Sequence, residues 1–289
     1  MLNYAAMANC SNGPTLGKLM TVQCENIDFD LKIAEFRING YTVIEDVLEV
    51  DTVDRIRAAF LPLLEHVRTR ENIIADKEWG DLRTGFGRQQ NPNRYTLHPP
   101  WVPPFAVPEV YENPVTLEFL KRYWNRDDFY IKCLHSNNPY PGTEYQQWHR
   151  DTPLPGEIPH VGLDTCPVLG VKFPLVDTSE ENGSVEVLPS TQYIANLDLQ
   201  SRYDDVLTQG DFPSARRLNM KKGSMWIQDP RMLHRGTPNT STEPRPEIVV
   251  CYGLSWIDIA HQMKLPPQTY DSLSERGREL FNFCQVVDY

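Results

Sequence analysis

The spacing of apolar residues divides the chain into a helical N-terminal part and a strand-rich remainder. Apolar side chains between residues 52 and 70 recur every three or four positions, which predicts an amphipathic helix with Asp51 as its N-cap. Two further helices and one strand are predicted over 28–39, 114–124 and 41–48. These elements form a predicted N-terminal helical layer.

From residue 128 onward, short apolar runs alternate with turn clusters rich in Gly, Pro and Asn, a pattern typical of strands. The absence of alternating helices argues against a doubly wound sheet. The chain is therefore predicted to form one domain over 25–289, a helical layer followed by an all-β barrel or sandwich at about 128–256. We expect the polar residues 1–24 to be poorly ordered. The predicted strands are 129–136, 170–176, 184–189, 224–228 and 247–256.

Residues 77–113 differ from both parts, because prolines are frequent there and aliphatic residues are few. This composition predicts a loop, and its central part carries Arg83, Arg88 and Arg94 without an acidic residue. We expect the segment to fold over the barrel mouth as a lid, with these arginines binding a polar, carboxylate-bearing substrate. An ordinary surface loop is the alternative.

Charge narrows the class of partner. The chain of 289 residues carries 39 acidic and 28 basic residues, a net charge of -11. This balance argues against nonspecific nucleic-acid binding and against docking on anionic membranes. No apolar run reaches the ~18 residues of a membrane span, and the first residues lack the pattern of a secretion signal. A cytoplasmic protein with a small-molecule partner is predicted, and its oligomeric state is left open.

The six cysteines are spaced too widely and irregularly for a disulfide framework or a zinc knuckle. Cys133 and Cys251 lie inside apolar, strand-like runs, so we expect them to be buried free thiols. His135, near Cys133, is expected to be a structural or pocket-lining residue.

One pair of residues carries the candidate chemistry. In the segment YQQWHRDTP, His149 and Asp151 are two residues apart, so on a strand their side chains point to the same face. His234, which follows a predicted strand, is the candidate third ligand. Two histidines and one carboxylate leave open positions on a metal ion, a set typical of non-haem Fe(II). Spacing alone also allows a half-buried strand histidine at 149 and an ordinary loop histidine at 234.

The sequence around these residues resembles the phytanoyl-CoA hydroxylase-like family of Fe(II)/2-oxoglutarate dioxygenases. In that family a W-H-x-D segment precedes a strand, an acidic N-G turn and a V-L-P-G-S-H-like run; here these read WHRD, GVKFPLVD and SEENGSVEVLPSTQ. The family then shows a lysine-glycine turn, a strand, a distal histidine with a following P-N, and an arginine eleven residues after that histidine. Here these parts read MKKGSMWIQDPRMLHRGTPN and Arg245. The resemblance covers most of residues 36–256. This sequence departs from the family pattern at two places. The usual P-G-S-H reads PSTQ, and the small residue that often follows the distal histidine is Arg235.

The resemblance implies a double-stranded β-helix, a jelly-roll or cupin-like barrel, that uses Fe(II), 2-oxoglutarate and O2. It implies that His149, Asp151 and His234 bind the iron. It also implies that Arg245 anchors the distal carboxylate of 2-oxoglutarate, because a guanidinium offers a rigid fork of donors to a carboxylate. Family members that halogenate replace the carboxylate ligand by a small residue, so an aspartate at 151 implies oxygen chemistry.

Four further residues are candidates for the site. Lys172 corresponds to a family strand position that faces the co-substrate, and the alternative is a lysine on the solvated face of the barrel. Thr237 follows the distal histidine and could bond a carboxylate. Gln147 alternates with His149 and could share its face. We expect Arg235 to narrow the site or to contact the substrate.

The predicted activity is oxidation of a C–H bond, by hydroxylation or oxidative dealkylation, with release of succinate and CO2. The expected substrate is a small polar metabolite, amino-acid-derived or a natural product, since no basic cluster suits the phosphates of an acyl-CoA. Two other functions are compatible with the same ligands. One is a non-catalytic barrel that binds metal and 2-oxoglutarate. The other is a zinc hydrolase with Glu144 or Glu157 as general base.

Overall fold

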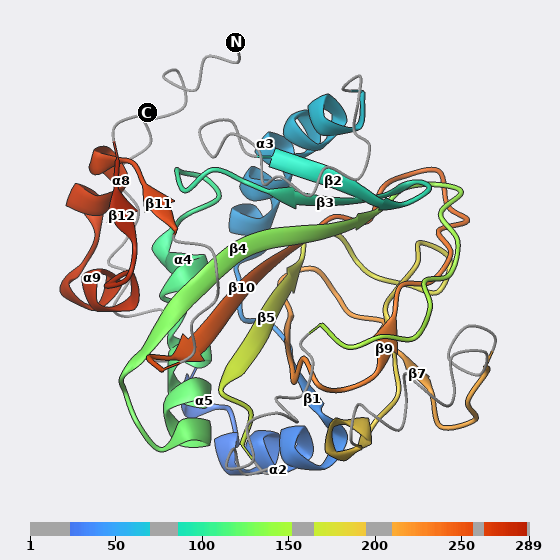
Figure 1. Cartoon of the computed structure of the whole chain (residues 1–289), viewed down its shortest axis with the longest axis horizontal. Coiled ribbons are helices and arrows are strands. Elements are labelled where there is room, and N and C mark those ends of the chain that lie inside the picture. Colours follow the sequence, from blue (N-terminus) through green and yellow to red (C-terminus); the bar gives the residue numbers. More distant parts are fainter. Residues whose placement is uncertain (1–23, 70–85, 152–164, 195–209, 257–262, 288–289) are drawn as a thin grey trace.

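A seven-stranded antiparallel sheet forms the centre of the computed structural model (Figure 1). The structure describes residues 24–69, 86–151, 165–194, 210–256 and 263–287. All five strands predicted after residue 128 are present, four of them in this main sheet and one in a smaller sheet. In spatial order the main sheet contains β1 (Tyr41–Ile44), β8 (Met225–Gln228), β5 (Val168–Pro174), β10 (Glu247–Leu254), β4 (Phe129–Pro139), β3 (Arg94–His98) and β2 (Phe86–Asn91).

Two smaller sheets complete the strand structure. The first is three-stranded and antiparallel, with β6 at its centre, and it contributes β9 to the site described below. The second is a parallel pair near the C-terminus. The three-stranded sheet contains β7 (Arg216–Arg217), β6 (Glu186–Val187) and β9 (His234–Arg235). The parallel pair contains β11 (Lys264–Leu265) and β12 (Gln285–Val286).

The two faces of the main sheet differ in chemistry because side chains alternate along each strand. On β5, Val171 and Phe173 belong to the large apolar core, whereas Lys172 between them lines a polar pocket on the opposite face. On β8, Trp226 and Gln228 share that opposite face, while Met225 and Ile227 join the core. One face of the sheet is therefore apolar and the other is available for a functional site.

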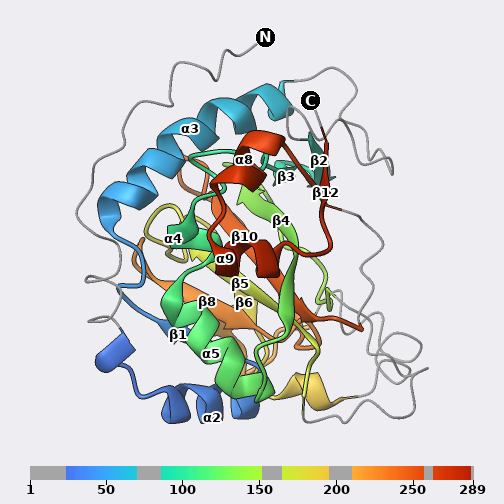
Figure 2. The same cartoon turned by 90° about the vertical axis from the view of Figure 1, so that its left-hand side faces the viewer.

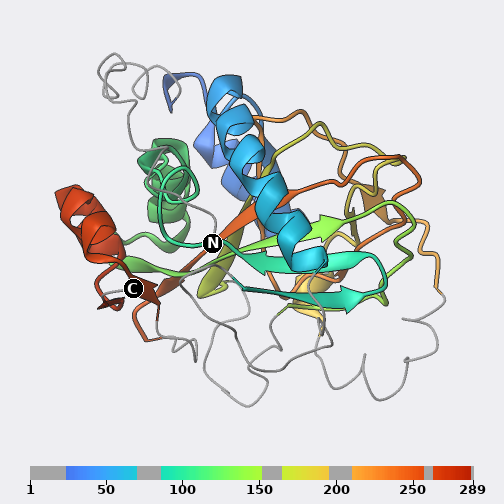
Figure 3. The same ribbon diagram turned by 90° about the horizontal axis from the view of Figure 1, so that it is seen from above.

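Helices cover the apolar face. The longest, α3, buries a stripe of side chains and lies against the β2–β3 end of the sheet (Figure 3). The C-terminal helices α8 and α9 lie at one side of the molecule, on the opposite side from β9 and β7 (Figures 1 and 2). None of the helices in the described ranges is long and apolar enough to cross a bilayer. The helices are α2 (Phe29–Asn39), α3 (Val50–Arg68), α4 (Pro108–Tyr111), α5 (Pro114–Trp124), α8 (Pro267–Ser272) and α9 (Glu275–Leu280), with a 3-10 turn at Thr191–Tyr193.

The helices predicted from apolar spacing are confirmed, with small differences at their ends. Helix α3 begins at Val50, so Asp51 lies in its first turn and not at the N-cap, and Glu49 in the N-cap position makes no side-chain cap. The predicted strand over 41–48 is shorter than expected and ends at Ile44.

The prediction of a loop over 77–113 is wrong for much of the segment. Residues 86–98 form the β2–β3 hairpin at the edge of the main sheet, and α4 follows. The hairpin is stabilised by pairing of β3 with β4, a contact with a strand about 40 residues away that proline content and sparse aliphatic residues do not reveal. Residues 70–85 lie outside the described ranges.

The cap of helix α5 connects this helix to the N-terminal layer. The buried Asn113 accepts hydrogen bonds from the backbone amides of Val115 and Thr116, and its Nδ2 donates to the carbonyls of Val47 and Glu109. Loss of the Asn113 side chain would leave several buried backbone groups without this hydrogen-bond partner.

We expect Asn113→Ala to lower the free energy of unfolding by about 1–2 kcal/mol, because both the helix cap and the amide donors are removed. Urea denaturation followed by circular dichroism measures this change. The control is Leu31→Ala on α2, a side chain that is 62% exposed, for which a change within about 0.5 kcal/mol is expected. Equal effects of the two substitutions would contradict this account of the cap.

Candidate metal centre

The three predicted ligands come together between β9 and the segment that precedes residue 152. His149 and His234 form an isolated antiparallel bridge, in which each backbone amide donates to the other's carbonyl at 3.0 Å. The Asp151 amide donates to Pro230, also at 3.0 Å. The Asp151 Oδ1 atom lies 3.4 Å from His234 Nε2 and 3.8 Å from His149 Nε2. One ligand atom from each residue thus lies within 4.8 Å of the others.

Backbone carbonyls orient both imidazoles. The Nδ1 atom of His149 donates to the Gln147 carbonyl at 2.8 Å, and Nδ1 of His234 lies 3.1 Å from the Met232 carbonyl. The proton on Nδ1 of His149 leaves its Nε2 lone pair free for a metal ion. Outer contacts of this kind fix the tautomer of metal-binding histidines.

The protonation states also suit a metal ion. Burial lowers the pKa of His149 to about 4, and the neighbouring His234 adds to this shift, so the imidazole is neutral at pH 7. Desolvation acts to raise the pKa of Asp151, but His234 and Lys172 outweigh it and hold this pKa well below its ordinary value. A neutral imidazole and an ionised carboxylate are the forms in which these two groups coordinate divalent metals.

Gln228 links the triad to the main sheet and was not among the residues predicted from sequence. Its Nε2 lies 2.9 Å from Nδ1 of His234, and its Oε1 accepts a hydrogen bond from Lys172. Lys172 also lies over the Trp226 ring, 4.3 Å from its centroid. The only sequence signal for Gln228 was a buried polar residue in an apolar strand.

A pocket extends from the triad into a cluster of cationic groups. Lys172, Arg245 and Arg94 line it together with the triad, and both arginines are buried. The Nε atoms of Arg94 and Arg245 have no hydrogen-bond partner among the described residues. Burial, followed by the proximity of Arg245, lowers the pKa of Arg94 to about 9. Buried guanidinium groups with unpaired donors favour an anion.

Neighbouring residues fix the two arginines. Arg245 Nη1 lies 3.5 Å from Glu247 Oε2, which accepts a hydrogen bond from Trp226 Nε1 at 3.1 Å. Arg94 donates to the Thr237 carbonyl at 2.9 Å. Gly236 permits this approach, because a Cβ atom at this position would overlap the Arg94 guanidinium.

Arg94 therefore differs from its predicted place in a lid. It lies on β3 and lines the pocket together with Arg245, whose charge helps to lower the pKa of Arg94. Arg88 lies on strand β2, and Arg83 lies outside the described ranges. The lid interpretation thus remains a prediction for these two residues.

Three other candidates do not line the pocket. Gln147 is exposed, since the chain before His149 is irregular and does not alternate like a strand; its neighbour Gln146 lines the pocket instead. The Thr237 hydroxyl donates to the Ser184 carbonyl at 2.8 Å. Arg235 is buried on the other face of β9, paired with Glu186 at 2.6 Å.

Comparison with known proteins adds to this geometry. The chain matches the phytanoyl-CoA dioxygenase (PhyH) family over residues 36–246. It is also similar to three solved structures, each with sequence identity too low to establish more than the fold. HygX from Streptomyces hygroscopicus, solved with nickel and 2-oxoglutarate, has 16% identity and a TM-score of 0.57, over 90% of this chain and 96% of that chain.

The other two structures give the same result. SnoK, a non-haem α-ketoglutarate-dependent carbocyclase from nogalamycin biosynthesis, has 21% identity and a TM-score of 0.59, over 84% of this chain and 88% of that chain. AviO1 from Streptomyces viridochromogenes Tue57 has 19% identity and a TM-score of 0.58, over 82% of this chain and 99% of that chain. These likenesses, with the antiparallel sheets and helices described above, confirm the predicted fold class.

The contact between Gln228 and His234 predicts a measurable effect on metal affinity. We expect Gln228→Leu to weaken Ni2+ binding roughly 10- to 100-fold, because an outer contact that orients a ligand is lost. Calorimetric titration measures this, and the binding step that disappears in His149→Ala identifies the centre. Gln268→Leu, at an exposed position of α8, is the matched control. Unchanged affinity in Gln228→Leu would show that the amide does not orient His234.

Proposed function

Because the chain belongs to the phytanoyl-CoA dioxygenase (PhyH) family of Fe(II)/2-oxoglutarate-dependent oxygenases, we propose that it oxidises a C–H bond of a small polar metabolite. The observation that carries the proposal is a single pocket containing both the triad and the buried pair of Arg94 and Arg245. A dicarboxylate co-substrate needs both features, a metal at one end and a cationic site at the other.

The residues of the triad fit Fe(II). His149, Asp151 and His234 would hold it, since their ligand atoms converge and a neutral His149 and an ionised Asp151 suit a divalent ion. Bound Fe(II), together with 2-oxoglutarate and O2, supplies the oxidising chemistry that releases succinate and CO2. A carboxylate at 151 occupies the place that a halide would need, which supports oxygenation.

The chain's own residues bind and position the co-substrate. We assign the distal carboxylate of 2-oxoglutarate to Arg245, with Arg94 as a second donor beside it. Glu247 and Trp226 hold Arg245 in place, so its guanidinium is oriented before the anion enters. Burial strengthens the attraction, because charges interact more strongly where water is excluded.

The nature of the substrate rests on weaker support. HygX has been solved with hygromycin B bound, and SnoK acts in nogalamycin biosynthesis. These neighbours favour a natural-product metabolite, and an amino-acid-derived compound is the second class we propose. Hydroxylation and oxidative dealkylation are both compatible with the site, and Arg83 and Arg88 remain candidates for contacting the substrate.

The zinc-hydrolase alternative is less well supported. A hydrolase needs a free general base near the metal. Among described acidic residues, Glu247 lines the pocket but is bonded to Trp226 and close to Arg245, while Glu144 is exposed and does not line it. Glu157 lies outside the described ranges. A non-catalytic barrel would leave the family's chemistry unused.

The roles of the two arginines can be separated by kinetics. We expect Arg245→Gln to raise the KM for 2-oxoglutarate roughly 100-fold, because two charge-assisted hydrogen bonds are lost. Arg94→Gln should raise the same KM roughly tenfold. Succinate formation at varied 2-oxoglutarate is the measurement, and Arg216→Gln, at an exposed position, is the control. If Arg94→Gln changed only the KM of the metabolite, Arg94 would be a substrate residue as first predicted.

Metal replacement tests the class of reaction. Anaerobic addition of Fe(II) and 2-oxoglutarate should produce a visible charge-transfer band that is absent in His149→Ala and His234→Ala. Admission of O2 with a panel of metabolites should then give succinate, and protein loaded with Zn2+ should be inactive because zinc has no redox chemistry. Turnover supported by zinc would favour the hydrolase.

A further inference from the structure

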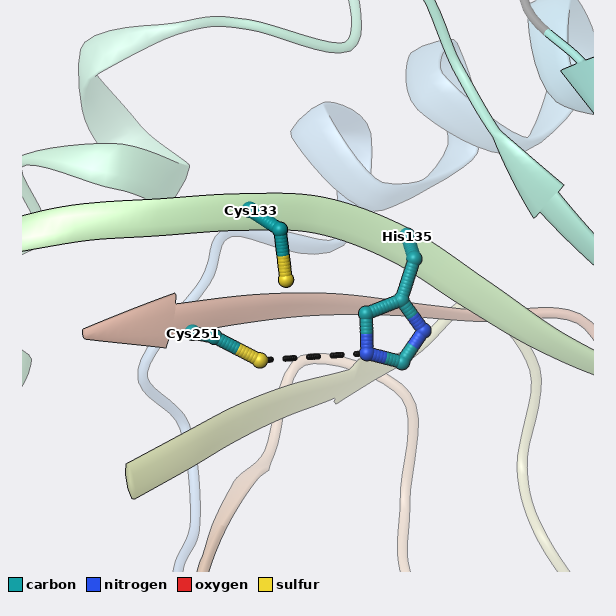
Figure 4. Close-up of side chains that lie close together, drawn as sticks. All are labelled: Cys133, His135 and Cys251. Carbon is teal, nitrogen blue, oxygen red and sulfur yellow. Dashed lines mark hydrogen bonds between the residues drawn. The ribbon is translucent and has the colours of Figure 1, made fainter. Parts of the chain in front are cut away.

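A second group of potential metal ligands lies on two neighbouring strands of the main sheet. Cys133 and His135 are two residues apart on β4, and Cys251 on β10 is directly opposite Cys133. The Cys251 Sγ lies 3.8 Å from His135 Nε2, and the ligand atoms of all three residues lie within 4.8 Å of one another. Figure 4 shows the three side chains converging between the strands.

Strand register places this group on the same face as the triad. Directly paired residues of an antiparallel sheet share a face. Cys133 pairs with Cys251, Cys251 with Gly170, and Gly170 with Gln228, whose side chain contacts His234. This row of residues therefore crosses the sheet from the cysteines to the triad, and Gly170 between them adds no side chain.

The donor set indicates the class of ion. Two thiolates and one imidazole favour Zn2+ and other thiophilic ions over those that prefer oxygen ligands. On tetrahedral zinc, with Zn–S of about 2.3 Å and Zn–N of about 2.0 Å, a sulfur and a nitrogen ligand are roughly 3.5 Å apart. The separation of 3.8 Å between Cys251 Sγ and His135 Nε2 is close to this value.

We propose that Cys133, His135 and Cys251 form a second metal site, distinct from the triad, that binds Zn2+ or a similar thiophilic cation. Three protein ligands leave one coordination position for water or another small ligand. Such an ion would join β4 to β10.

The exposure of the three residues is compatible with this assignment. All three residues are partly exposed, so the two cysteines are free thiols as predicted but are not fully buried.

A cobalt titration tests the site separately from the iron centre. The reduced double variant His149→Ala/His234→Ala should bind one equivalent of Co2+ with a thiolate-to-cobalt charge-transfer band in the near ultraviolet. Adding Cys133→Ser and Cys251→Ser should abolish the band, whereas adding Cys284→Ser, a half-buried cysteine elsewhere, should preserve it. Zn2+ should raise the Tm of the His149→Ala/His234→Ala protein. It should leave unchanged the Tm of the protein that also carries Cys133→Ser and Cys251→Ser.

A second measurement avoids any folding defect of the triad variants. The triad of reduced wild-type protein is first filled with Ni2+ and 2-oxoglutarate, and the protein is then dialysed against Zn2+. Wild-type protein should retain one equivalent of zinc, and Cys133→Ser/Cys251→Ser protein should retain none. No thiolate band in reduced protein, or equal zinc content in wild-type and double-serine proteins, overturns the proposal. These readouts do not depend on turnover, so they stand apart from the proposed oxygenase activity.

Discussion

Two reciprocal backbone hydrogen bonds between His149 and His234 are the constraint on which the centre depends. They join parts of the chain that are far apart in sequence, and pairing of β9 with β6 holds one of these parts in the smaller sheet. The main chain therefore sets the positions from which the two imidazoles converge. The Gln147 carbonyl then needs only to fix the tautomer of His149.

The second constraint is electrostatic. Arg94 and Arg245 are buried close together, with unpaired Nε donors, although desolvation of a guanidinium is costly. Their positions are maintained by neutral and acidic neighbours, a backbone carbonyl for Arg94 and Glu247 for Arg245. Such a pocket has an excess of positive charge that an anionic co-substrate would neutralise. This explains why a chain with a net charge of -11 concentrates cations at one place.

The main sheet carries the second group of ligands and also the residues that contact the triad. Its apolar face packs on the helices, and the alternate residues of β4, β5, β8 and β10 form the opposite face. A shift of one residue in any pairing would move the whole alternate set to the other side. Register therefore positions Lys172 and Gln228 beside the triad and also places Cys133 opposite Cys251.

The sequence alone determined the features that depend on local spacing. Apolar periodicity identified α3 and the five strands after residue 128, and family motifs identified the triad and Arg245. Tertiary structure decided the rest. It placed Arg94 in the pocket through the pairing of β3 with β4, turned Arg235 and Gln147 away from it, and brought Gln228 to His234. Local periodicity reports which face of an element is apolar, but hydrogen bonds between distant strands decide which polar residues meet.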